Sequence, residues 1–180
     1  MGLLDERSYY KPFNYPWAFE NYKLQQQMHW LPSEVNLADD LRDYKEKLTV
    51  ENRRLITQIF RFFTQADVDV CAGYAQHYLP TFKQPEVRMM LASFASMEAV
   101  HQEAYSLLLE TLGFADEEYQ MFLEYEAMLN KHQYLSDFGT STPTELAKTM
   151  AIYSAFTEGV QLFSSFAILL NFPRHNLMKG

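Results

Sequence analysis

Cysteine is almost missing from this sequence. The 180 residues contain one, Cys71, and a single thiol cannot form a disulfide within the chain. This excludes the disulfide framework of a small secreted domain and a zinc site built from several thiolates. We therefore expect a reducing compartment and predict a cytoplasmic protein.

Basic residues and long apolar runs are also scarce. Lys and Arg number 15 against 23 Asp and Glu, which gives a net charge of −8 and disfavours a nucleic-acid partner. The first thirty residues contain no uninterrupted apolar segment of the signal-peptide kind. One uncharged stretch, Gly159 to Pro173, is shorter than the roughly 20 residues that span a bilayer. We expect no membrane partner and predict a buried helix there.

Glycine and proline are few enough to leave long stretches free for helices. There are six Gly and seven Pro, while 48% of the residues are hydrophobic and 21% are charged, so the chain can form a core. No alternating strand pattern occurs. Apolar spacing of three and four residues predicts helices at 33–47, 49–79, 84–112, 117–132 and 144–171, with a loop at 135–143. The fold class is therefore all-α, with several helices of about 25 to 30 residues, as in a bundle.

Aromatic residues are concentrated at the amino terminus. Residues 1–33 contain three prolines and eight rings, a density too high for a solvated tail. We interpret 1–33 as an aromatic arm packed against a body formed by 34–180.

One predicted helix has ionisable groups inside its apolar stripe, which reads Leu91, Phe94, Glu98, His101, Tyr105, Leu108 and Leu112. A buried carboxylate needs a partner, a proton or a metal. Glu98 and His101 are one turn apart, and Glu-x-x-His lets one helix offer two ligands to one metal. The alternative is a surface Glu beside a hydrogen-bonded core His.

Two other helices repeat the pattern. Asp67 lies on the stripe that contains Phe63 and Val70, whereas Asp69 lies off it and is expected to be solvated. Glu158 is the only charge between Lys148 and Arg174, again within an apolar stripe. Three carboxylates on three apolar faces indicate a shared metal site. Oxygen-rich ligation with one imidazole suits iron or manganese better than zinc.

These segments resemble the radical-generating small (β) subunit of class I ribonucleotide reductase, a ferritin-like di-metal protein. The resemblance is carried by MHWLPSEV, RFFTQADVDV, SFASMEAVHQEAYSLLLETLG and FTEGVQLFSSFAILLNF. It implies a ferritin-like bundle that activates oxygen at two metals to form a tyrosyl radical, which a partner uses to reduce ribonucleotides to deoxyribonucleotides. Iron is the expected metal, with manganese or a mixed manganese–iron pair left open.

The resemblance also implies roles for single residues. Asp67, Glu98 and His101 would bind one metal, and Glu158 would bind the second, with Glu98 able to bridge the two.

Four further residues match the redox part of the family pattern. Tyr105 would carry the radical, and Trp30 would lie on the electron path to the partner. Leu162 and Phe166 would form an apolar shield around the radical. Alternatively, Tyr105 is an ordinary core tyrosine, and Trp30 is an anchor for the arm.

The sequence departs from the family at its carboxyl end. The family has a second Glu-x-x-His, but His132 and His175 are preceded at that spacing by Leu129 and Phe172. The family binds its two metals with six protein ligands, and this sequence contains four of them. We therefore expect a fragment or the first half of a split subunit, completed by a C-terminal portion or partner chain. The expected partners are that half, the large catalytic subunit and, when complete, a second copy in a homodimer.

Two other functions remain as alternatives. One is a ferritin-like di-iron monooxygenase or oxidase, against which Asp67 and Tyr105 count, because such enzymes more often use Glu as the first ligand and need no redox tyrosine. The other is a non-catalytic metal-storage bundle, which needs neither Trp30 nor Tyr105.

Overall fold

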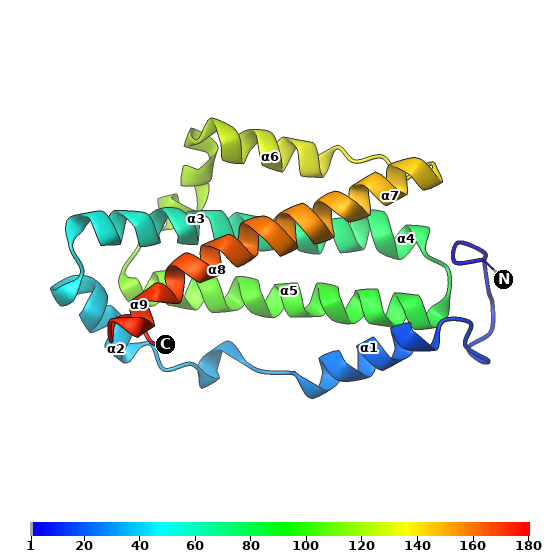
Figure 1. Cartoon of the computed structure of the whole chain (residues 1–180), viewed down its shortest axis with the longest axis horizontal. Helices are drawn as coiled ribbons and strands as arrows, with labels where there is room; N and C mark the ends of the chain where they lie inside the picture. Colours follow the sequence, from blue (N-terminus) through cyan, green and yellow to red (C-terminus); the bar gives the residue numbers. More distant parts are fainter. Residues whose placement is uncertain (1) are drawn as a thin grey trace.

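Two long antiparallel helices form the centre of the molecule. The computed structural model describes residues 2–180 and contains no strand in that range, which confirms the all-α prediction. Helix α3 (Val50–Gly73) lies beside α5 (Pro85–Leu112), as Figure 1 shows. Thr49 caps α3 by accepting a hydrogen bond from the backbone N–H of Asn52. Gly113, at φ 84°, ends α5 in the left-handed region that favours glycine.

The predicted arm contains a helix of its own. Helix α1 (Pro16–Gln27) runs along α5 and buries Ala18 completely. The predicted helix at 33–47 begins later than expected. A 3₁₀ turn, η1 (Pro32–Glu34), comes first, followed by α2 (Ala38–Arg42) and the π-helical η2 (Asp43–Lys47). Ser33 therefore lies inside η1 and does not cap a helix.

The predicted helix at 117–132 is divided in two. Residues Asp116–Glu124 form the 3₁₀ segment η4, and α6 (Glu126–Ser136) follows. Tyr125 separates them with extended backbone at φ −103° and ψ 108°. Its hydroxyl accepts hydrogen bonds from Gln58 and Arg61 of α3, so a tertiary contact coincides with the break.

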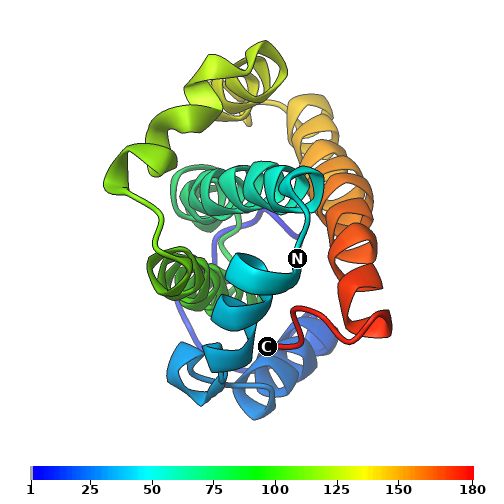
Figure 2. The same cartoon turned by 90° about the vertical axis from the view of Figure 1, so that its left-hand side faces the viewer.

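A nearly continuous helical stretch ends the chain. It consists of α7 (Pro143–Ala151), the π-helical η5 (Ile152–Leu162), α8 (Phe163–Leu169) and the short α9 (Asn171–Arg174). Thr142 and Glu145 form a capping box at its start. In Figure 1 this stretch crosses α3 and α5 diagonally, and Figure 2 shows it as a layer on one side of them. A third π-helical segment, η3 (Tyr74–Tyr78), continues α3 and leads into α4 (Leu79–Thr81).

Two apolar clusters form the core. One surrounds Ile56, Phe60 and Phe63 between α3 and the carboxyl end of α5. The other surrounds Val70 and Tyr153, where α3 meets η5. Asp67 of α3 comes between Phe63 and Val70 in the sequence, so the acidic residue separates the two clusters.

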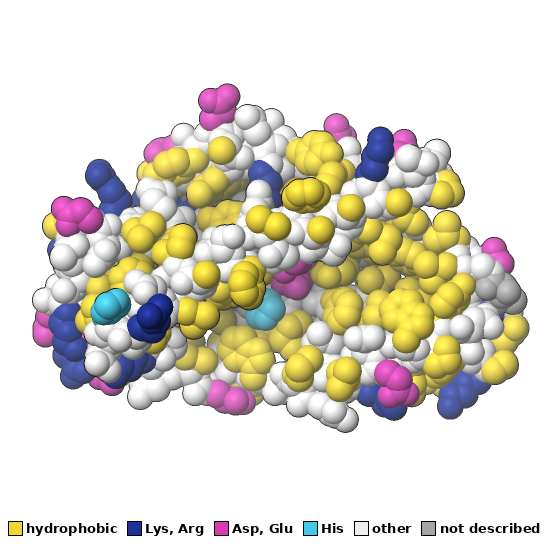
Figure 3. All heavy atoms as spheres, viewed as in Figure 1, with side chains coloured by type: hydrophobic (Ala, Val, Ile, Leu, Met, Phe, Trp, Pro, Cys, Tyr) yellow, Lys and Arg dark blue, Asp and Glu magenta, His cyan; other side chains and the backbone are white. Residues whose placement is uncertain are grey.

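The buried helix predicted at 159–173 is largely exposed. Phe163 is 70% exposed and Leu170 64%, because only one side of this stretch meets α3 within the chain. Hydrophobic side chains are visible along it in Figure 3. By length and composition, Pro143–Arg174 is the one candidate membrane span among residues 2–180, with 11% of its apolar window buried. One such helix is weak evidence for a membrane, since helices that pack against other protein helices share this composition.

Candidate metal centre

Helices α3 and α5 bring three ligand-type side chains together. Asp67, Glu98 and His101 each offer an atom within 4.8 Å of the others. Asp67 is 2% exposed, and His101 Nδ1 lies 3.2 Å from Glu98 Oε2. Gln102 Nε2 donates to the backbone carbonyl of Asp67 at 3.2 Å, which ties the two helices together at this level. The predicted Glu-x-x-His face therefore points at the predicted Asp.

The charges in this group are poorly balanced by the protein itself. Burial, reinforced by the negative charge of Glu98, raises the pKa of Asp67 from 3.8 to about 7. The hydrogen bond to Glu98 raises the pKa of His101. Asp67 Oδ2 is buried and has no hydrogen-bond partner among the described residues. An unpartnered buried carboxylate oxygen is costly, and a bound cation would remove that cost. The donor set therefore fits a metal ion.

Glu158 approaches the group from η5. It is half-buried, and burial followed by the charge of Glu98 raises its pKa to about 7. It is not part of the group whose ligand atoms all lie within 4.8 Å of one another. Figure 3 shows acidic and histidine side chains at the floor of a hollow beside the last helical stretch. This arrangement suits a ligand to a second ion next to the first.

Tyr105 lies among aromatic rings one turn beyond His101. It stacks on Phe63 with ring centroids 5.0 Å apart, and Phe166 packs against Phe63 at 4.9 Å. Burial, followed by the charges of Asp67 and Glu98, raises the pKa of the Tyr105 phenol.

The predicted shield is only partly closed. Leu162 packs against the same core cluster, whereas Phe166 is 37% exposed. A cavity of about 310 Å³ is lined by both Tyr105 and Phe166. Leu162 therefore packs against the same core cluster as Tyr105, and Phe166 lines the open space beside the Tyr105 ring.

Trp30 packs against a candidate ligand. Its ring centroid lies 6.3 Å from that of His101, with the planes inclined by 34°. The indole is half-buried. The partly exposed ring of Trp30, which lies between α1 and η1, is therefore adjacent to the ring of the candidate ligand His101.

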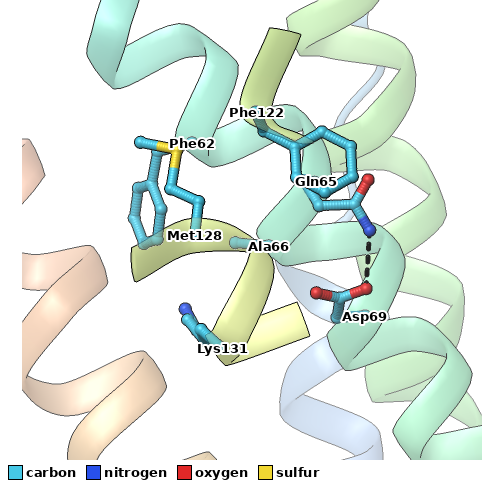
Figure 4. A pocket seen from close by; sticks show the side chains of 7 residues that line it. All are labelled: Phe62, Gln65, Ala66, Asp69, Phe122, Met128 and Lys131. Carbon is cyan, nitrogen blue, oxygen red and sulfur yellow. Dashed lines mark hydrogen bonds between the residues drawn. The ribbon is translucent and has the colours of Figure 1, made fainter. Parts of the chain in front are cut away.

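Asp69 is not solvated, contrary to the prediction. It is 8% exposed, its Oδ1 lies 2.7 Å from His132 Nδ1, and it accepts a hydrogen bond from Gln65 Nε2 at 2.6 Å. Figure 4 shows Asp69 and Gln65 at the edge of a pocket between α3 and α6. The helical wheel correctly separates Asp69 from Asp67. It cannot show that α6 covers the second face.

A lysine near the centre escaped the sequence analysis. Lys131 of α6 lies in the same pocket (Figure 4), with Nζ 4.5 Å from the centre of the Phe62 ring. This nitrogen is buried and has no hydrogen-bond partner among residues 2–180. Burial lowers the pKa of Lys131, and the charges of Asp69 and Glu158 oppose that shift. The sequence does not indicate that Lys131 lies near the candidate ligands, because it belongs to a helix without a ligand motif.

Comparison with known proteins identifies relatives over nearly the whole chain. The family model for the ribonucleotide reductase small chain matches residues 7–180. A probable ribonucleoside-diphosphate reductase small subunit of Invertebrate iridescent virus 6 is 47% identical, over 100% of this chain and 54% of that protein. The ribonucleoside-diphosphate reductase β subunit of Chlamydia pneumoniae is 28% identical, over 94% of this chain and 53% of its own length. The chain thus spans about half the length of these curated relatives.

Solved structures share the fold. The R2 subunit from Clostridium botulinum superposes with a TM-score of 0.82 at 20% identity, over 91% of this chain and 53% of that one. A variant of an R2-like ligand-binding oxidase with a Mn/Fe cofactor gives a TM-score of 0.69 at 19% identity, over 89% of this chain and 62% of that one. These similarities agree with the predicted ferritin-like bundle. With a family match that covers residues 7–180, the chain belongs to the ribonucleotide reductase small-chain family.

Proposed function

We propose that this chain is the amino-terminal half of a radical-generating small subunit of class I ribonucleotide reductase. The observation that carries the proposal is the position of Tyr105. Its ring is stacked on Phe63, one turn beyond His101, on the helix that brings Glu98 and His101 to Asp67, whose Oδ2 is buried without a hydrogen-bond partner among the described residues. A storage bundle has no need for an oxidisable ring at that position.

The donor geometry supports a ligand set for the metals. Asp67, Glu98 and His101 would hold the first ion, and Glu158, together with Glu98, would hold the second. Iron is the proposed metal, and manganese or a manganese–iron pair is the alternative, since these ligands accept all three combinations. Metals held by these residues would supply, with dioxygen, the oxidising power for Tyr105.

Tyr105 supplies one electron and one proton. The proton on its Oη would pass to one of the carboxylates of the centre, whose negative charges act on this phenol. Phe63 and Leu162 exclude water and reductants from one side of the ring. Trp30, against His101, provides the electron path toward the large subunit, where ribonucleotides are reduced.

The remaining ligands come from a second polypeptide segment. The chain covers about half of its relatives and contains no second Glu-x-x-His. We propose that the complementary C-terminal half packs on the exposed side of η5 and α8 and that the completed subunit is a cytoplasmic homodimer. Exposed Phe163 and Leu170 support this placement, since apolar surfaces of that kind are usually covered.

The test is formation of a radical in the reassembled subunit. The chain is mixed with the C-terminal half of the viral relative, loaded with ferrous iron without oxygen, and then exposed to oxygen. We expect a tyrosyl radical in the electron paramagnetic resonance spectrum, which Asp67→Ala abolishes. Full iron loading and oxygen consumption without any tyrosyl signal would contradict the proposal.

A di-metal oxidase on the same fold is the second candidate. A cavity of about 250 Å³, lined mostly by apolar side chains such as Tyr74 and Phe94, reaches Glu158 and would admit an apolar substrate. Oxygen-dependent modification of an added apolar substrate, with no radical on Tyr105, would favour this candidate.

A further inference from the structure

Tyr153 crosses α3 at a position where only glycine fits. A Cβ on Gly73 would lie 2.5 Å from Tyr153 Oη and 2.6 Å from its Cζ, closer than real Cβ atoms approach other atoms. Gly73 has ordinary helical backbone angles, with φ −59°, so no left-handed conformation explains the glycine. The absence of a side chain at Gly73 serves the approach of Tyr153.

The hydroxyl of Tyr153 joins three helical segments. Tyr153 is 5% exposed, and its Oη lies 3.2 Å from the carbonyl oxygen of Leu135 in α6 and 3.5 Å from that of Asp69 in α3. Tyr153 itself belongs to η5. The ring also packs against Phe138 at 5.3 Å and Tyr78 at 5.6 Å. Its position is therefore set from several sides.

Two of these segments, α3 and η5, also carry candidate ligands. Asp67 lies on α3 six residues before Gly73, and Glu158 lies on η5 five residues after Tyr153. In a π-helix the hydrogen bonds join residues five apart, so Tyr153 and Glu158 are neighbours one turn apart. Both line the same cavity, together with Val70 of α3. A displacement of Tyr153 is therefore transmitted directly to Glu158.

We infer that Tyr153, seated against Gly73, is the positioning residue that sets the distance between Glu158 on η5 and the Asp67 group on α3. The inference rests on the proposed metal centre. It adds the contact that aligns the ligand on η5 with the ligands on α3 and α5. The prediction is steric. A methyl group at position 73 pushes Tyr153 outward and carries Glu158 away from the other ligands.

The test measures manganese(II) binding by the full 180-residue chain, with free manganese(II) followed by electron paramagnetic resonance. Gly73→Ala is expected to weaken binding about 10- to 100-fold, the usual range for residues that orient metal ligands. Tyr153→Leu shortens the side chain and loses the same alignment. In the Tyr153→Leu background, Gly73→Ala should therefore have no further effect. Tyr153→Phe keeps the ring on Gly73 and should retain most of the affinity.

Two controls separate alignment from general destabilisation. Leu146→Ala removes a buried side chain from the same core cluster and should lower the melting temperature while manganese affinity stays unchanged. Asp67→Ala tests the metal centre itself. If wild type and Asp67→Ala bind manganese equally, the proposed function fails. If Asp67→Ala loses binding but Gly73→Ala and Tyr153→Leu match wild type, the positioning role alone is overturned. An equal loss of affinity in Leu146→Ala also overturns it, and where Gly73→Ala does not fold, Tyr153→Leu decides.

Discussion

Asp67 and Asp69 are two residues apart on α3 and have opposite surroundings. Asp67 faces Glu98 and His101, and one of its carboxylate oxygens has no partner among residues 2–180, whereas Asp69 is hydrogen-bonded to Gln65 and lies against His132. An unpartnered buried carboxylate oxygen is costly unless a cation binds it, whereas the partners of Asp69 offset the cost of its burial. We therefore expect Asp67 to serve metal binding and Asp69 to serve stability.

This difference predicts two distinct phenotypes. Asp67→Ala should abolish manganese(II) binding. Asp69→Ala should leave binding nearly intact but lower the free energy of unfolding by about 1–3 kcal/mol, because Gln65 and His132 lose a charged partner. Metal titration and thermal unfolding of both variants check this. Equal metal loss in the two variants would mean that Asp69 also belongs to the centre.

At Tyr105, the prediction concerns one oxygen atom. Tyr105→Phe keeps the ring on Phe63, so the free energy of unfolding should change by no more than about 1.5 kcal/mol, and metal content should not change. The radical signal of the reassembled subunit should disappear. Tyr119→Phe is the matched control, because Tyr119 packs against the same cluster and its hydroxyl lies 3.0 Å from Ser106 Oγ. A wild-type radical signal in Tyr105→Phe would assign the radical to another tyrosine.

The raised pKa values of Asp67 and Glu158, both about 7, predict how stability depends on pH. Between about pH 4 and pH 7 the folded metal-free chain holds protons that the unfolded chain has released, so its stability falls as pH rises through this window. The melting temperature of the metal-free chain should therefore drop from about pH 5 to about pH 8. The Asp67→Asn/Glu158→Gln variant should lose most of that drop. A melting temperature that rises over this range would contradict the assignment.

Helices α3 and α5 could be predicted from sequence because their apolar spacing is regular and their ends have local signals. Thr49 and Gly113 mark two of those ends, and Glu98 with His101 interrupts an otherwise apolar stripe. The π-helical and 3₁₀ segments could not be predicted. These forms have the same residue preferences as α-helices, and tertiary contacts such as those of Tyr125 and Tyr153 accompany them here. The burial of Asp69 was missed for the same reason, since it depends on a helix about sixty residues away.

Substitution of Gly113 tests whether its left-handed backbone conformation explains why α5 is followed by glycine. Its φ of 84° is unfavourable for residues with a Cβ, yet an added Cβ would meet no atom within 4 Å. The cost of Gly113→Ala is therefore purely conformational, about 1–2 kcal/mol. Gly113→Asn should cost less, because asparagine tolerates the left-handed region. Chemical denaturation of both variants measures this. A larger loss for Asn than for Ala would show that space, not backbone conformation, limits this site.

On the scale of the whole molecule, the chain leaves one side of its last helical stretch open. The exposed apolar residues on η5, on α8 and directly after α8 include Phe156, Val160, Phe163 and Leu170. They lie beyond the ligands on the side where the proposed complementary half would pack. The free chain should therefore expose an apolar surface that favours self-association, next to its candidate metal centre.

Substitution of that surface should change solubility more than stability. Phe163→Ser/Leu170→Ser should reduce self-association of the isolated chain with little change in melting temperature, because both side chains are mostly exposed. The same variant should bind the complementary half more weakly. Sedimentation velocity of the chain alone and of the mixture measures both effects. A soluble monomeric wild type that is unaffected by the substitutions would argue against this docking face.

Within the π-helical stretch Ile152–Leu162, the number of residues between Tyr153 and Glu158 determines which way Glu158 points. Each residue turns an α-helix by about 100° and the wider π-helix by somewhat less. Deleting one residue between Tyr153 and Glu158 would leave every candidate ligand in the sequence but turn Glu158 away from Asp67. Inserting one would do the same in the opposite sense. Among related sequences, a one-residue gap at this point would therefore distinguish chains that assemble the centre from chains that only retain its residues.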